Sequence, residues 1–153
     1  MFASQLFVRG PGQTHPTLLI LEEAHHYLRQ LPGTDDGAGQ MRAYERLAKE
    51  GRKFGLSLLV STQRPSELSS TVLAQCGTWA VFRLSNEADQ KAVAAATEAA
   101  SGHVVSQVAG LGRGESIVFG AALKVPSRIN VRRPNPHPDS ADPPFTREWD
   151  REK

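Results

Sequence analysis

The chain has 153 residues, of which 39% are hydrophobic, and this is enough for one compact domain with a buried core. Its 18 basic and 16 acidic residues leave a net charge of +2, which is too small to indicate a nucleic-acid partner by itself. Cys76 is the single cysteine and excludes an intrachain disulfide, while the lack of a signal-like start and of a long apolar run predicts a cytoplasmic protein with no membrane partner.

The first half of the sequence contains two apolar runs that predict buried strands, with a helical pattern between them. Residues 1–16 show no clear period and are expected to be irregular. After the first strand, an acidic pair is expected to begin a helix that Pro32 ends. The elements predicted here are a strand at 17–21, a helix at 22–31, a flexible loop at 33–39, a helix at 41–53 and a strand at 56–61.

The second half predicts shorter elements and then a change of character. Asn86 or Ser85 is placed to cap an alanine-rich helix, and Gly120-Ala121-Ala122 is typical of a hairpin turn. Five of the ten prolines follow Arg132, so residues 132–153 are expected to form an extended tail. The elements predicted here are a helix at 70–75, a strand at 78–84, helices at 86–100 and 104–108, and strands at 115–119 and 124–131.

Strands alternate with helices between residues 17 and 131, and this order predicts a mostly parallel α/β sheet flanked by helices, with a β-hairpin at its carboxyl end. The chain therefore divides into an irregular segment (1–16), an α/β core (17–131) and a proline-rich tail (132–153). In a parallel sheet, polar residues that follow neighbouring strands meet at one edge. The residues after the first two strands are therefore candidates for a functional site.

Glu22 and Glu23 directly follow the first strand. Hydrolysis of ATP needs an oxygen ligand for Mg²⁺ and a base that orients the attacking water, and two consecutive acids can supply both. We assign Glu22 to the metal and Glu23 to the water. The alternative is that both acids only stabilise the amino end of a helix. His25 and His26 complete two overlapping Glu-x-x-His patterns, but a di-iron site needs such patterns on separate helices.

Thr62, Gln63 and Arg64 follow the second strand. A hydroxyl, an amide and a guanidinium at the edge of a sheet can contact phosphate or the attacking water, and Gln63 is the predicted sensor. The alternative is a turn whose polar residues only satisfy the end of the strand, with Pro65 setting the bend.

Arg46 and Arg52 lie in the basic end of the second predicted helix. Such an end is often a solvated face that complements the helix dipole. The functional alternative is an arginine finger offered to the γ-phosphate of a neighbouring subunit.

In order and spacing, these segments resemble the HerA-like family of hexameric DNA translocases and helicases, which are P-loop ATPases related to FtsK. The resemblance extends from about residue 17 to residue 131. It is carried by Glu22-Glu23-Ala24-His25, by residues 46–56, by Thr62-Gln63-Arg64-Pro65-Ser66, by Phe82-Arg83-Leu84-Ser85-Asn86, by Asp89-Gln90 and by residues 114–120 and 126–128.

The resemblance implies the carboxyl-terminal half of a RecA-like core, with ATP and Mg²⁺ as cofactors. Its Walker B acids are Glu22 and Glu23, its sensor is Gln63, and its favoured trans arginine finger is Arg52, with Arg46 as a second candidate. It also implies a homo-oligomeric ring around double-stranded DNA and, as a further partner, a NurA-type nuclease.

The sequence departs from the family pattern because it contains no Gly-x-x-x-x-Gly-Lys-Ser/Thr loop to hold the phosphates. The chain alone is therefore not expected to hydrolyse ATP. Two alternatives stay open. One is a non-catalytic module that assembles with full-length ATPase subunits, and the other is an autonomous domain with no nucleotide role.

Overall fold

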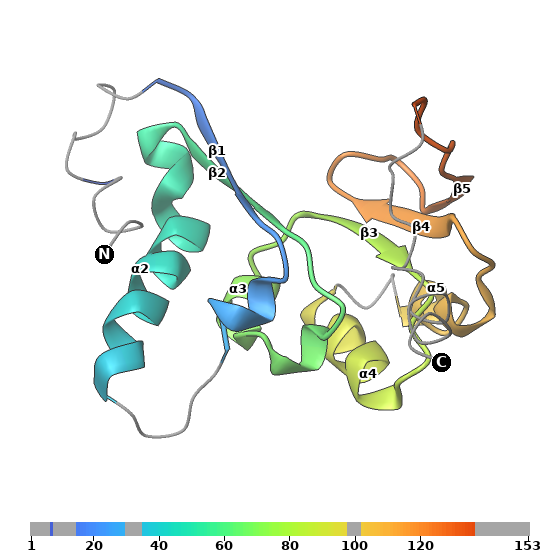
Figure 1. The fold of residues 1–153 in the computed structure, drawn as a ribbon, viewed down its shortest axis with the longest axis horizontal. Coiled ribbons are helices and arrows are strands. Elements are labelled where there is room, and N and C mark those ends of the chain that lie inside the picture. Colours follow the sequence, from blue (N-terminus) through green and yellow to red (C-terminus); the bar gives the residue numbers. More distant parts are fainter. Residues whose placement is uncertain (1–6, 8–14, 30–34, 98–101, 137–153) are drawn as a thin grey trace, which may run out of the picture.

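The computed structural model of the chain describes residues 7, 15–29, 35–97 and 102–136. Its first unit is a parallel pair of strands with a helix between them in the sequence. Strand β1 (Thr17–Leu21) pairs with β2 (Leu56–Val60) so that Leu19 faces Leu58, and α2 (Asp35–Glu50) with the 3-10 turn η2 (Gly51–Phe54) connects them. Figure 1 shows α2 running alongside the two strands.

The second sheet is antiparallel and lies beyond a group of short helices (Figure 1). Its strands are β3 (Thr78–Phe82), β4 (Glu115–Gly120) and β5 (Ser127–Asn130), in that order. The remaining helical elements are η1 (Ala24–His26), η3 (Pro65–Glu67), α3 (Ser70–Leu73), α4 (Glu87–Ala96), α5 (Gly102–Val105) and η5 (Val108–Gly110).

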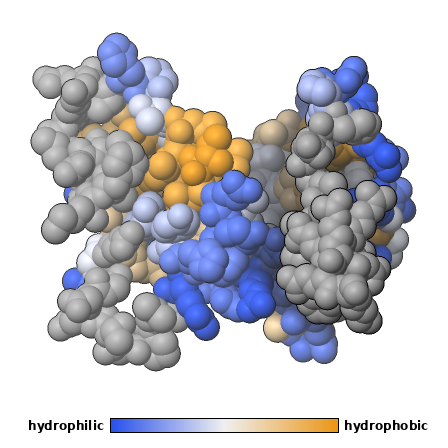
Figure 2. Space-filling model, in the orientation of Figure 1, coloured by the Kyte–Doolittle hydropathy of each residue, from blue (hydrophilic) through white to orange (hydrophobic). Residues whose placement is uncertain are grey.

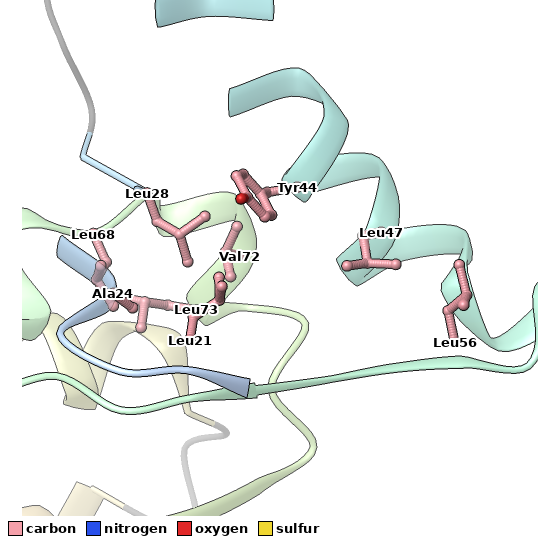
Figure 3. Packing of buried hydrophobic residues seen from close by; sticks show 9 residues of the cluster. All are labelled: Leu21, Ala24, Leu28, Tyr44, Leu47, Leu56, Leu68, Val72 and Leu73. Atoms are coloured by element: carbon pink, nitrogen blue, oxygen red, sulfur yellow. The ribbon is translucent and has the colours of Figure 1, made fainter. Parts of the chain in front are cut away.

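Two apolar clusters form the core. The first brings together side chains from β1, η1, α2, β2 and α3; its buried members are Leu21, Ala24, Leu28, Tyr44, Leu47, Leu56, Leu68, Val72 and Leu73 (Figure 3). The second lies between the antiparallel sheet and the helices α4, α5 and η5, and includes Val81, Val93 and Phe119. Trp79 packs against both clusters, so the two sheets share one continuous core.

The α/β class, the parallel pair, the flanking helices and the carboxyl-terminal hairpin are all confirmed. Strand β3 differs from the expected parallel arrangement, because it pairs antiparallel with β4 and Phe82 faces Ser116. The segment that connects β3 to β4 therefore leaves and re-enters the sheet at the same end of the strands. A parallel crossover would instead run back to the opposite end.

The expected helix at 22–31 is wrong in its described part. Glu23 has φ 48° and ψ 50°, a left-handed conformation that cannot continue a right-handed helix, and only the short turn η1 follows it. Helix α2 begins at Asp35, inside the segment expected to be a loop. The expected features at 1–6, 8–14, 30–34 and 98–101 and most of the tail, 137–153, lie outside the described residues.

One face of the parallel pair is open to solvent. Leu19 and Leu21 turn towards the core, whereas Leu18, Ile20 and Leu59 on the other face are 55%, 60% and 45% exposed. Figure 2 shows the apolar area that they create over β1 and β2. Parallel sheets are normally covered on both faces.

Among the described helices, none has both the length and the apolar character that crossing a bilayer requires.

Candidate functional site

The candidate site forms where β1 and β2 end. Ser61 donates its amide to the carbonyl of Leu21 at 2.8 Å, and Ala24 donates to the carbonyl of Ser61 at 2.9 Å, so the ladder continues past both strands. The residues that follow β1 and β2 therefore leave the sheet side by side. This juxtaposition is what a parallel pair dictates at its carboxyl edge.

Glu23 and Gln63 are in direct contact at this edge. The side-chain amide of Gln63 donates to Oε1 of Glu23 at 2.8 Å, although 40 residues separate them in the sequence. Glu23 is the one non-glycine with positive φ in the described part of the chain. That conformation costs roughly 1–2 kcal/mol for a residue with a Cβ atom. Such strain at a functional side chain is common where its direction matters.

His25 lies beside this pair. Its Nδ1 is 3.4 Å from Oε2 of Glu23 and 3.4 Å from Oγ1 of Thr62, and its side chain is only 16% exposed. Oγ1 of Thr62 also accepts the amide of Arg64 at 3.1 Å. This contact was not predicted, because the 3-10 turn that brings His25 back to Glu23 follows from the left-handed backbone of Glu23.

Glu22 stands apart from these contacts. It is exposed in the turn after β1, and its side chain has no hydrogen bond or ion pair with any described residue. Its carboxylate is therefore available to a cation, although the described residues contain no group of three or more His, Cys, Asp or Glu side chains that could hold a metal ion.

Arg64 is engaged by its own neighbour. Its Nη1 donates to Oε1 of Glu67 at 2.8 Å, and Nε of Arg29 lies 3.8 Å from the other oxygen of Glu67. This hydrogen bond lowers the pKa of the Glu67 carboxyl and raises the pKa of Arg64 from its ordinary value. The guanidinium reaches the edge of the site but does not contact Glu23.

Arg46 and Arg52 lie at the opposite end of the strands. Arg52 is exposed in η2, just before β2 begins, and Thr17 at the start of β1 donates to the carbonyl of Gly55 there. Arg46 pairs with Glu50 at 3.2 Å and its guanidinium lies 4.6 Å from the centre of the Phe7 ring. Five residues of strand, roughly 16 Å, separate this end from Gln63. The structure therefore does not bring either arginine to the acids of the same subunit.

A buried carboxylate supports the turn that carries Gln63. Oδ1 of Asp89, on the first turn of α4, accepts the Ser66 amide at 3.0 Å and the Ser66 hydroxyl at 2.6 Å. Asp89 is 6% exposed, whereas capping of α4 is done by Asn86, whose side chain accepts from Ala88. The sequence pattern gives no sign of this contact, because 23 residues separate Ser66 from Asp89.

Comparison with known proteins finds curated relatives and solved structures that are similar to the chain, although no family model matches it. The chain is 40% identical over 121 residues to the DNA double-strand break repair helicase HerA of Pyrococcus furiosus, covering 79% of this chain and 21% of that protein. With the HerA helicase of Sulfolobus acidocaldarius the identity is 30% over 145 residues, covering 95% and 28%. The chain thus spans about a quarter of the length of these curated relatives.

Solved structures agree on the fold. The genome packaging NTPase B204 of Sulfolobus turreted icosahedral virus 2, in complex with ATP-gammaS, matches with a TM-score of 0.61 at 19% identity, over 76% of this chain and 53% of that one. At this identity the likeness shows the fold alone. Together, these comparisons show that the matched segment of the chain is similar in sequence to HerA helicases and similar in fold to a packaging NTPase.

Proposed function

We propose that this chain supplies the acids and the sensor of a HerA-like, ATP-dependent DNA translocase or helicase. The observation that carries the proposal is the 2.8 Å hydrogen bond from Gln63 to Glu23 at the shared edge of β1 and β2. It unites an acid and an amide that the sequence separates by 40 residues. In this role Glu22 ligates Mg²⁺, Glu23 orients the attacking water, and Thr62 and Arg64 lie towards the nucleotide.

The geometry of the site is consistent with a water-orienting role for Glu23. Phosphoryl transfer depends mainly on positioning and on charge stabilisation, so the acid that orients water must be held in a fixed direction. The left-handed backbone of Glu23 and its contacts with Gln63 and His25 fix that direction. Because Gln63 donates its amide hydrogen to Glu23, its carbonyl oxygen stays available to accept a hydrogen bond from the same water.

The proposed reaction needs a phosphate-binding loop, which this sequence does not contain. The loop would come from another part of the assembly, and the ATP site would form where the two meet. A homo-oligomeric ring, double-stranded DNA and a NurA-type nuclease are the partners that this function implies.

The test uses the assembly that contains both this chain and a phosphate-binding loop. Glu23→Gln should retain ATP binding but lose turnover by at least about 10²-fold, because the amide cannot act as a base. Glu87→Gln is the matched control, since Glu87 is exposed on α4 and pairs only with Lys91. Wild-type turnover in Glu23→Gln would refute the role assigned to Glu23.

A second candidate function is a non-catalytic module that assembles with full-length ATPase subunits. The exposed apolar face of Leu18, Ile20 and Leu59 favours it, because a parallel pair is normally covered on both faces. Titrating the chain into a HerA-like ATPase that has its own phosphate-binding loop should then change ATP turnover. Ile20→Lys should abolish that change, and a lack of any effect from the wild-type chain would exclude this candidate.

A further inference from the structure

A cleft lies at the end of β3, and none of its lining residues belongs to the Glu23 and Gln63 site. It has a volume of about 390 Å³ and is lined by Phe82, Arg83, Gly112, Arg113, Gly114 and Glu115. Its walls come from the end of β3 and from the turn before β4, which are adjacent because Phe82 pairs with Ser116. This volume is at the lower end of the range for sites that hold small organic ligands.

The charge of the cleft is positive. Arg83 and Arg113 form no ion pair with any residue that the structure describes. Glu115 is the one acid in the lining, and its Oε2 already accepts from Nη2 of Arg128 and from the amide of Gly112, both at 2.6 Å. Its carboxylate is therefore neutralised from outside the cleft, and two guanidinium groups are left for an anionic ligand.

The remaining lining residues define what else the ligand must present. The Phe82 side chain is 50% exposed, although large apolar side chains at strand ends are usually buried. An exposed aromatic ring beside arginines can stack on a planar base. A Cβ atom on Gly112 would lie 3.0 Å from Oε2 of Glu115, and Gly114 has φ 80°, a conformation that favours glycine.

We infer that this cleft binds a nucleotidyl unit, with its phosphate on Arg83 and Arg113 and its base on Phe82. The same chemistry occurs in a nucleic-acid strand and in a free nucleotide. A strand is favoured because the cleft is open, and stacking on Phe82 requires an unpaired base. The choice of nucleic acid over a free nucleotide rests on the proposed function, and the choice of a single strand over a duplex rests on the exposed ring of Phe82. The cleft and its charges depend on neither.

The binding test measures fluorescence anisotropy of labelled oligonucleotides with the 153-residue chain, without ATP. A single strand should bind more tightly than a duplex of the same length. Phe82→Ala should weaken single-strand binding about tenfold with an unchanged salt dependence, because the stacking of one base is lost. Phe82→Tyr, which keeps the ring, should retain binding.

The arginines are tested by the salt dependence. Arg83→Gln and Arg113→Gln should each weaken binding and reduce the slope of log affinity against log salt by about 0.7, the value for one phosphate contact on a single strand. Arg42→Gln is the matched control, because Arg42 is exposed on α2 and lies outside both sites. If thermal melting shows that a glutamine variant does not fold, binding is measured instead with Arg83→Lys or Arg113→Lys, which keep the charge but lose the planar guanidinium.

Three results would overturn the inference: no binding of any oligonucleotide or of AMP, unchanged affinity in both arginine variants, or a preference for duplex that Phe82→Ala leaves unaltered. Binding of labelled AMP that is weakened by the same substitutions, without strand binding, would support the cleft and identify a free nucleotide as its ligand. Glu23→Gln should bind oligonucleotides normally, so failure of the cleft and failure of the ATPase proposal are separate results.

Discussion

At the scale of single residues, the candidate site depends on side chains that do not themselves touch a nucleotide. Ser66 lies three residues after Gln63, the proposed sensor, and both its amide and its hydroxyl donate to one oxygen of Asp89. A buried carboxylate is stable only when it is hydrogen-bonded in this way. The turn that carries Gln63 is therefore held by α4 as well as by β2.

Removal of this contact should lower the free energy of unfolding. Asp89→Ala leaves the amide and hydroxyl of Ser66 without their partner and should cost about 1–3 kcal/mol, whereas Asp89→Asn keeps an acceptor oxygen and should cost less. Urea unfolding measures both. Glu87→Ala, in the same turn but paired only with exposed Lys91, should change stability by less than about 1 kcal/mol. Equal losses in the two alanine variants would contradict the argument.

At the scale of secondary-structure elements, α2 and β2 meet through a position that admits only glycine. A Cβ atom on Gly51 would lie 2.9 Å from the backbone carbonyl oxygen of Leu56 and 3.2 Å from a methyl group of Leu47. The close approach allows the chain to turn from η2 directly into the strand. It also sets where Leu47 and Leu56 enter the first core cluster.

Two glycine substitutions should therefore have opposite effects. Gly51→Ala forces backbone and core atoms apart and should destabilise the protein by about 1–3 kcal/mol. In Gly39→Ala, within α2, the added Cβ meets nothing within 4 Å, and the variant should be more stable by about 0.5–1 kcal/mol because alanine loses less conformational entropy than glycine. Thermal unfolding distinguishes them, and a stabilising Gly51→Ala would show that the contact is relaxed in solution.

The β4–β5 hairpin has a contact that should depend on pH. Hydrogen bonds from Arg128 and from the amide of Gly112 lower the pKa of the Glu115 carboxyl. A carboxyl with a depressed pKa in the folded state stabilises the protein above its unfolded pKa, about 4.3, and this contribution is lost as the pH falls through the folded value.

The prediction is that the melting temperature falls between about pH 5 and pH 3 less steeply in Glu115→Gln than in the wild type. The variant has no charge at this position to lose. Glu87→Gln serves as the control and should follow the wild-type curve, because its pairing with Lys91 is on the exposed surface of α4. Identical curves for all three proteins would contradict the assignment.

At the scale of the whole molecule, the two ends of β1 and β2 have different chemistry. Acids and the sensor lie at one end, and Arg46 and Arg52 at the other, with the open apolar face of Leu18 and Ile20 between them. If Arg52 acts as an arginine finger, it must act on a neighbouring subunit, because it does not reach the acids of its own. The trans role predicted for Arg52 therefore requires that several subunits assemble.

Mixed assemblies test this role. Arg52→Ala should lower ATP turnover of the complete assembly by about 10³–10⁵-fold if it removes a finger. Mixing it with Glu23→Gln subunits should restore part of the activity, because some interfaces then combine an intact Glu23 with an intact Arg52. Arg42→Ala subunits mixed with Glu23→Gln provide the control for dilution. If the Arg52 mixture stays inactive, the role in trans is refuted.

Much of the core could be predicted from the sequence because its signals are local. The apolar runs predicted β1 and β2, the capping side chain of Asn86 predicted the start of α4, and the glycine at the end of β4 predicted the hairpin. The presence of Glu22, Glu23 and Gln63 at strand ends followed from the same runs. The contact between Glu23 and Gln63 could be expected from parallel pairing.

The sequence by itself determined the α/β class, the strands, the candidate acids and sensor and the likeness to HerA, since periodicity and residue order are properties of short segments. Only the tertiary structure decided that Glu23 is left-handed, that His25 and Asp89 support the site, that β3 is antiparallel to β4 and that Arg83 and Arg113 share a cleft. These features depend on contacts between residues far apart in the chain, whose energies no local pattern contains.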